Sequence, residues 1–422
     1  MRVPLGIFIV TPLLLSPAFA GAQEQTILLE PLVGEILRDN RELAAFESTA
    51  KAAGERSVAA GAFPAPTVGF AVRSVPVPSF SFTEDEMTMA EVMISQRIPW
   101  FGKRELRREA EGKVADATAR TAEAAKLELA EAAVDAYAGL WLSLASREVI
   151  DRQAADLQRL ATLARSRLAS GGEKQADVLR AQMEVARIRV PLLQLRQEEA
   201  RQRATLGALL SRGEPLGGSP ELPSSSALPS EAELFTSIEA HPELAALSVE
   251  EERAKLDARL ASKDKWPDPE VGVAYGFRAG LPDMVSAEVS IPLPIFAGSD
   301  QDRRAAAARA DARAAANKRE ARRSTLLGEA RAAYAAAEAL AERLAVYEDE
   351  ILPRARLTVQ SATGAFQSGG VDFLTVLDAQ VRRNGEELDA MRTRAELLRA
   401  KARLARAAGS LSFLFPSEGR HE

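Results

Sequence analysis

The most constraining feature of this sequence is an internal duplication, in which two similar copies lie about half a chain apart. The matched segments keep their order: residues 40–45 match 241–246 at an offset of 201, 63–66 match 266–269 at 203, 98–101 match 293–296 at 195, Tyr137 matches Tyr334 at 197, and 171–182 match 369–380 at 198. Five anchors in one order are not expected by chance. The chain must therefore fold as two copies of one unit.

Each copy has the pattern of a helix, two strands, a very long helix, a glycine turn and a further helix. Residues 103–169 predict a helix of about 100 Å at 1.5 Å per residue, which no compact domain contains. The shorter helices predicted at 31–62 and 173–212 add up to a similar length, and the second copy repeats the plan with 299–368, 371–412 and 231–263. The predicted fold is mainly α with a small β part, built as a tall wall of antiparallel helices.

The chain divides into five segments on this pattern. We predict a signal peptide at 1–20, a first structural repeat at 21–212, a linker at 213–230 that is rich in Gly, Pro and Ser, a second repeat at 231–415 and a C-terminal tail at 416–422. The signal peptide has Arg2, an apolar run and an Ala-x-Ala site that ends at Ala20, with cleavage after Ala22 as the alternative. The apolar run is shorter than the roughly 20 residues that an uncleaved anchor needs.

Four short segments alternate between apolar and polar residues, as strands do when their two faces meet different surroundings. They are predicted at Thr67–Val75, Met87–Arg97, Glu270–Arg278 and Met284–Ile291, and each polar face carries charge: Glu91, Glu288, Arg73 and Arg278. A half-buried sheet of a soluble protein shows similar alternation. Strands of about nine residues also suit a tilted bilayer crossing, and four strands cannot close a barrel without further chains.

These features together resemble the TolC-like outer-membrane efflux family over the whole mature length. The resemblance rests on the duplicated plan, on the strand exits 96-QRIPWFGKR-104 and 290-SIPLPIFAGS-299, and on the turn motifs at 170–182 and 368–380. It implies a homotrimer whose twelve strands form one β-barrel in the Gram-negative outer membrane, among outer-membrane lipids. A periplasmic α-helical barrel would continue it. The chain would be the passive exit duct for a periplasmic adaptor and an inner-membrane pump.

The strand exits look most like those of outer-membrane components of heavy-metal pumps of the resistance-nodulation-division type, for copper and silver or for cobalt, zinc and cadmium. Many relatives in this subgroup carry a lipidated N-terminal cysteine, whereas this chain has no cysteine at all. Disulfides and thiolate metal sites are therefore excluded. Anchoring then depends on the barrel alone.

Composition argues against the other classes of function. The net charge of −6 makes nucleic acid an improbable partner, since binding to phosphates depends on basic residues. His241 and His421 are the only imidazoles, no phosphate-binding loop follows a strand, and no nucleophile, base and acid converge. We expect no enzyme activity and no cofactor. The remaining rival is a periplasmic coiled-coil adaptor or scaffold protein, which would share the helices but not the duplicated strand pairs.

The resemblance also implies a gate at the two glycine turns. Asp177 and Asp378 occupy the family's tip motif, and threefold symmetry would converge six carboxylates on one opening. Lys174 and Arg180 are candidates to hold them, and Thr375 stands where a second acid is expected. The alternative is that both aspartates only stabilise the starts of their own helices.

A speculative metal site involves methionines of the strands. Met87, Met89 and Met93 are predicted on the strand face of Glu91, and the repeat aligns Met284 with Met87. Thioethers bind soft ions such as Cu(I) or Ag(I). The alternative is that methionine fills space.

Overall fold

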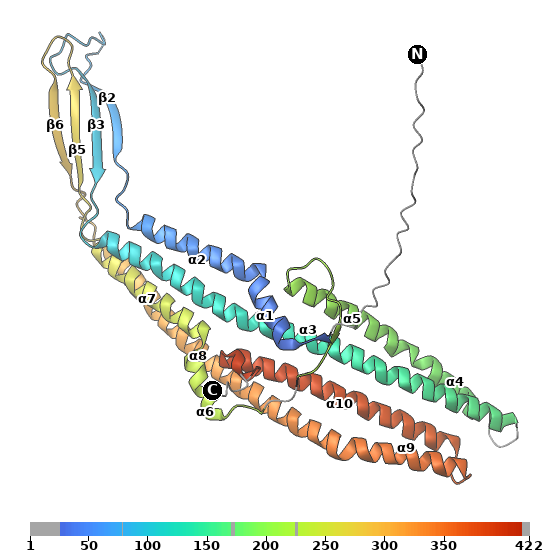
Figure 1. Ribbon diagram of the computed structural model, residues 1–422. Helices are drawn as coiled ribbons and strands as arrows, with labels where there is room; N and C mark the ends of the chain where they lie inside the picture. The colour runs from blue at the N-terminus through green and yellow to red at the C-terminus, as the bar shows by residue number, and fades with distance from the viewer. Residues whose placement is uncertain (1–25, 78, 170–173, 224–226, 416–422) are drawn as a thin grey trace, which may run out of the picture.

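A computed structural model of the chain describes residues 26–77, 79–169, 174–223 and 227–415. The predicted signal peptide, the C-terminal tail and the first glycine turn lie outside these residues. Figure 1 shows a small sheet at one end of the molecule and the ends of two helical hairpins at the other, joined by helices that run side by side. This elongated arrangement matches the predicted wall of helices.

The first repeat contains the longest helix of the molecule. Its elements are α1 (Leu29–Asp39), α2 (Arg41–Ala60), β2 (Thr67–Arg73), β3 (Met89–Arg97), α3 (Lys103–Ala169), α4 (Gln175–Arg187) and α5 (Arg189–Leu209). Helix α3 is continuous over 67 residues, as predicted. The predicted helix at 173–212 is wrong in one respect, because it is interrupted at Ile188 between α4 and α5, close to Pro191. A proline near a helix start removes a backbone donor and favours such a break.

The second repeat follows the same order. Its elements are α6 (Glu231–Glu239), α7 (Pro242–Lys263), β5 (Glu270–Phe277), β6 (Met284–Ser290), α8 (Gln301–Ala345), the π-helical turn η1 (Val346–Ile351), α9 (Leu352–Gln367), α10 (Phe373–Ala408) and the short 3-10 helix η2 (Leu411–Phe413). The π-helical turn lies just before Pro353, whose ring cannot fit against a regular α-helical turn. The second long helix is therefore interrupted where α3 is not.

Each repeat begins with two helices rather than the single helix predicted at 31–62 and 231–263. The breaks fall at the equivalent residues Asn40 and His241. The Asn40 side-chain oxygen accepts a hydrogen bond from Glu42 N over 2.9 Å, and His241 Nδ1 accepts one from Glu243 N over 3.1 Å. Both side chains cap the N-terminus of the following helix, which stops the preceding helix from continuing.

The sheet has the antiparallel order β2-β3-β5-β6, so its two central strands come from different repeats. Glu91 of β3 lies opposite Ala71 of β2 on one side and Gly276 of β5 on the other. Strands β2 and β6 are the free edges. The predicted strands are slightly too long: β2 ends at Arg73, and Met87 precedes β3.

The interior of the helical part is thin and rich in alanine. Its largest cluster surrounds the middle of α3, where Tyr137 is fully buried. The Tyr137 hydroxyl donates to Ile27 O over 2.7 Å and accepts from Glu221 N over 3.0 Å. Burial raises the pKa of Tyr137 to about 12. These bonds hold a two-stranded parallel sheet, β1 (Thr26–Ile27) with β4 (Ser219–Pro220), against α3 and thereby fix the linker between the repeats.

Candidate functional site

The outward face of the four-stranded sheet is apolar and exposed. Phe70 is 81% exposed and Val273 is 58% exposed, although both belong to regular strands. The same face carries Val68, Val72, Val92, Ile94, Val271, Tyr275, Phe277, Val285, Ala287 and Val289. A contiguous apolar surface of this size marks contact with lipid or with another protein.

The opposite face of the sheet is polar or has small residues. Glu91 is only 8% exposed, and Arg73 NH2 donates to Glu91 Oε1 over 3.2 Å. Glu288 occupies the equivalent place in the second repeat but is exposed, and the described residues offer it no hydrogen bond or ion pair. The two acids therefore differ in their surroundings. Glu91 is paired with Arg73, whereas the exposed Glu288 has no such partner among the described residues.

Arg278 follows the end of β5, so it does not lie within a strand. Its Nε donates to Pro282 O over 2.7 Å, and its NH1 donates to Glu86 O over 3.3 Å. These contacts join the β5–β6 loop to the β2–β3 loop. Arg278 thus fixes the loops at the far end of the sheet.

Two methionines pack against glycines of neighbouring strands. A Cβ atom added to Gly276 would lie 2.6 Å from Met89 Sδ, and one added to Gly272 would lie 3.9 Å from Met93 Sδ. Met284 is the register partner of Gly276, so Met89 and Met284 flank the same glycine on the polar face. The prediction that Met87 shares this strand face is wrong, because Met87 lies before β3 in an exposed connection.

The junction between sheet and helices is held by a buried lysine that sequence analysis did not single out. Lys103 Nζ lies 2.8 Å from Trp266 O and 3.0 Å from Asp268 Oδ1. The same carboxylate oxygen accepts a hydrogen bond from Trp100 N, and the rings of Trp100 and Trp266 stack at 5.2 Å. Trp100 and Lys103 both belong to the strand exit 96-QRIPWFGKR-104, which was the available signal. This contact fixes the end of the first repeat's strand to the second repeat.

The predicted gate residues belong to the starts of α4 and α10, and these helix ends lie far from the sheet (Figure 1). Asp177 is half-buried in the first turn of α4, and Asp378 is exposed in the second turn of α10. Lys174 and Arg180 are also exposed. In the part of the chain that the structure describes, no ion pair links either basic residue to either aspartate.

Asp372 is the acid that the sequence analysis missed at this tip. It caps α10, because its side chain accepts from Thr375 N over 2.9 Å and from the Thr375 hydroxyl over 2.5 Å. These hydrogen bonds, helped by the charge of Lys174, lower the pKa of Asp372. A helix-capping aspartate three residues before a threonine is a recognisable sequence signal. Asp372 is therefore the residue that caps α10 in this hairpin. Asp378 is not needed for the cap.

A polar layer joins the two hairpins a few turns from the tip. Gln380 Nε2 donates to Asp156 Oδ2 over 2.6 Å, and Arg383 lies 3.6 Å from the same oxygen. Arg383 also donates to Asn384 Oδ1 over 2.8 Å, and Asn384 is 1% exposed. The turn motif quoted for the second repeat ends at Gln380, so one function of the motif is to hold α10 against α3.

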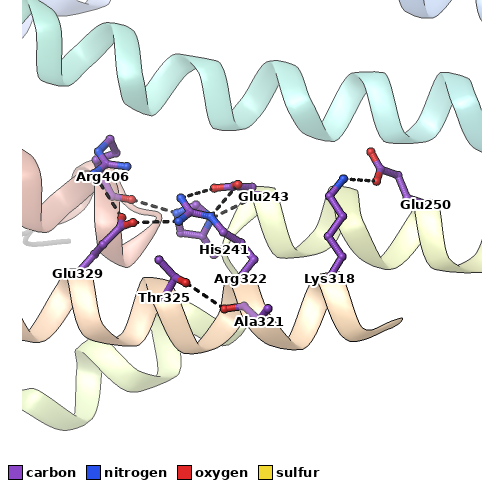
Figure 2. A network of polar contacts seen from close by, with 9 residues as sticks. All are labelled: His241, Glu243, Glu250, Lys318, Ala321, Arg322, Thr325, Glu329 and Arg406. Carbon is purple, nitrogen blue, oxygen red and sulfur yellow. Dashed lines mark hydrogen bonds and ion pairs between the residues drawn. The ribbon is translucent and has the colours of Figure 1, made fainter. Parts of the chain in front are cut away.

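A second polar network holds the helices where α6 meets α7 (Figure 2). Arg322 of α8 makes two hydrogen bonds to Glu243, of 2.7 and 2.8 Å, and a third to Glu329 of 2.9 Å. Glu329 in turn pairs with Arg406 of α10. These hydrogen bonds raise the pKa of Arg322 above its usual value. Three helices are therefore joined through one guanidinium and its acids.

His241 completes this network. Its Nδ1 accepts the cap hydrogen bond from Glu243, so its Nε2 carries the proton that is donated to Arg406 O over 3.0 Å. Burial lowers the pKa of His241, with the charges of Arg322 and Arg406 acting in the same direction and Glu243 opposing them. The imidazole is therefore held neutral.

Among the described residues, no group of three or more His, Cys, Asp and Glu side chains could hold a metal ion. No described helix combines the length and the apolar character that a membrane crossing requires.

Comparison with known proteins gives consistent matches. The model of the outer membrane efflux protein family matches residues 32–212 and 236–410, which are the two repeats. The fold is similar to the outer-membrane channel OprN (21% identity, 90% of each chain covered, TM-score 0.76), to CusC (17%, 90% of this chain and 92% of that chain, 0.76) and to VceC of Vibrio cholerae (19%, 90% and 96%, 0.75). No curated protein sequence matches.

Proposed function

Because this chain belongs to the outer membrane efflux protein family, we propose that it is the exit duct of a tripartite efflux system. Its location is the outer membrane, with a helical extension into the periplasm. The observation that carries the proposal is the sheet, which has one exposed apolar face and one face with charged residues. Its strands connect directly to long helices, of which α3 has 67 residues. A lipid-facing wall and a water-facing wall are what a pore requires.

We propose that three copies close the barrel. The sheet has four strands, and its edges β2 and β6 are unpaired within the described residues. Unpaired backbone groups are costly in a bilayer, so the edges must meet other strands. Three copies supply twelve strands, and their helices continue as one tunnel. Transport through it is passive, and residues 1–20 act as the export signal.

The proposed partners lie at the opposite end. A periplasmic adaptor and an inner-membrane pump would meet the hairpin ends near Asp177 and Asp378, which are farthest from the sheet. We propose that these two aspartates form a ring of six carboxylates that favours cations, with Lys174 and Arg180 close enough in sequence to modulate it. The separate capping role of Asp372 supports this assignment, because it leaves Asp378 free.

Planar-bilayer recording of the purified protein tests the duct. We expect discrete conductance steps from the wild-type oligomer and recovery of the protein with outer membranes. A periplasmic adaptor or scaffold would instead be released with the soluble periplasm and would give no conductance, which would overturn the proposal.

A narrower proposal concerns the cargo, for which we propose soft metal ions. It is supported by Met89 and Met284, which flank Gly276 on the polar face, since thioethers bind Cu(I) and Ag(I). Replacing Met89, Met93 and Met284 together with Leu should lower copper and silver tolerance of cells that depend on this duct, while the oligomer and its conductance persist. Met87→Leu is the matched control. Unchanged tolerance in the triple variant would refute the metal role.

A further inference from the structure

Within the sheet, the two repeats of one chain meet where β3 pairs with β5. In sequence, β5 is a second copy of β2, because residues 270–275 (EVGVAY) match 67–72 (TVGFAV) at an offset of 203. Likewise β6 is a second copy of β3, because Ala287-Glu288-Val289 matches Ala90-Glu91-Val92 at an offset of 197. The free edges β6 and β2 are thus equivalent to β3 and β5, which pair within the chain.

We propose that β6 of one copy pairs with β2 of the next in the register that β3 adopts with β5. Within the chain, Glu91 lies opposite Gly276 and Met93 lies opposite Ala274. The two offsets transfer these pairs to the seam between copies. There Glu288 lies opposite Arg73 of the partner subunit, and Ser290 lies opposite the partner's Ala71. This inference rests on the proposed function, which requires the copies to close a barrel.

Charge supports this register over its neighbours. The Arg73 side chain is 53% exposed although it binds Glu91, and Glu288 is exposed with no ion pair in the described part of the chain. At the seam, Arg73 would lie between Glu91 of its own chain and Glu288 of the adjacent chain. A guanidinium has five donors in a planar fork and can serve two carboxylates.

The alternative registers lose this match. A shift by one residue would turn the apolar face of one strand toward the polar face of the sheet. A shift by two residues preserves the faces but places Glu288 opposite Ala71 or Val75, so that Arg73 is only its diagonal neighbour and no longer lies directly opposite it. The sequence of β2 is similar to that of β5, which pairs with β3 within the chain. Because β6 is similar to β3, the strand that fits the β2 edge is β6 of a second copy of this chain.

Cysteine cross-linking tests the register directly, because the natural chain contains no cysteine. The in-register double variants are Ser290→Cys with Ala71→Cys on the polar face and Val289→Cys with Val72→Cys on the apolar face, so both classes of antiparallel pair are sampled. The control is Ser290→Cys with Gly69→Cys, which is two residues out of register. Directly opposite Cβ atoms are about 4.5–5.5 Å apart, whereas diagonal ones are too distant for a disulfide.

After oxidation we expect covalent trimers from at least one in-register variant and none from the control. Linkage only in the control, or no linkage in any variant that still forms oligomers, would overturn the register. As a second test, Glu288→Lys should lower the temperature at which the trimer dissociates in detergent, while Ser286→Lys on the same face should not. Equal loss in both would also count against it.

The wild-type protein separates this inference from the proposed function. A monomeric wild type without conductance would refute the duct itself. A conducting wild-type trimer that fails the cross-linking test would refute only the pairing of β6 with β2 in this register.

Discussion

Asn40 and His241 occupy equivalent positions in the two repeats, and each caps the second helix of its repeat with a side-chain acceptor. One acceptor is an amide oxygen and the other is an imidazole nitrogen. Only the imidazole can be protonated near neutral pH. The same break in the helix is therefore independent of pH in the first repeat and sensitive to pH in the second.

Acidification should weaken the second repeat through His241. Its pKa is lower in the folded chain than the ordinary value of 6.5, so the unfolded state binds a proton more readily. Its contribution is fully present above pH 6.5 and is lost as the pH falls through the folded pKa. In thermal unfolding at pH 8 and pH 5.5, His241→Asn should lose less stability on acidification than the wild type. Equal losses would show that His241 does not control this response.

A matched variant separates the cap from the titration. His241→Ala removes the acceptor at all pH values and should cost about 1 kcal/mol at pH 8. His241→Asn restores the acceptor that Asn40 provides in the first repeat, so at pH 8 it should be more stable than His241→Ala. If the two variants were equally stable, the cap would contribute nothing.

Charge on the apolar face of the sheet should prevent assembly. Ala287 lies mid-strand in β6 opposite Val273, and the preceding residue, Ser286, lies on the polar face. An arginine at a lipid-facing position near the bilayer centre costs about 2–4 kcal/mol. Ala287→Arg should therefore sharply reduce the yield of outer-membrane trimer, measured by its resistance to detergent, whereas Ser286→Arg should leave it near the wild-type level. Similar yields would mean that the faces are misassigned.

The gate proposal predicts a change in ion selectivity. Replacing Asp177 and Asp378 with Ala should abolish cation preference, measured as the reversal potential across a salt gradient, because the ring of carboxylates is lost. Asp372→Ala is the control. It should cost about 1 kcal/mol of helix stability through the lost cap and leave selectivity unchanged. If only Asp372→Ala changed the selectivity, the selective carboxylates would be those of Asp372 and not those of Asp177 and Asp378.

The junction between sheet and helices should depend on Lys103. Its side chain is 4% exposed and lies 3.0 Å from Asp268, so Lys103→Met leaves a carboxylate without its cation in a poorly hydrated place. Breaking such a pair costs about 3 kcal/mol or more. Lys113 lies on the same helix as Lys103 and makes a more exposed ion pair with Glu252. Lys113→Met should therefore cost less than about 1 kcal/mol in chemical unfolding. Equal costs would contradict the burial argument.

Periodicity over long segments was sufficient to predict the main architecture. The duplicated plan, the continuous helix α3 and the alternating faces of all four strands follow from residue spacing, and the structure and the family match confirm them. The breaks at Asn40 and His241 were not predicted, because the helical residue pattern runs through both. The proline after His241 was the local signal, since proline favours a first helical turn.

Contacts between distant segments could not be predicted in the same way. The bond of Gln380 to Asp156 and the burial of Lys103 depend on how the two repeats pack, which residue spacing does not encode. Glu91 and Glu288 look identical in sequence because both alternate onto the polar face. They differ in the sheet, because Glu91 lies on a central strand beside Arg73 and Glu288 lies on the edge strand β6.

The exposed outer face of the sheet has a consequence for biogenesis. If three copies close the barrel as proposed, a single copy keeps this apolar face and the free edges β2 and β6 until it meets the others in the membrane. In the periplasm, insertion into the membrane therefore competes with aggregation, because edge strands and apolar surfaces promote both processes. We therefore expect the number of assembled channels to depend on how fast copies reach the membrane as well as on the stability of a single copy.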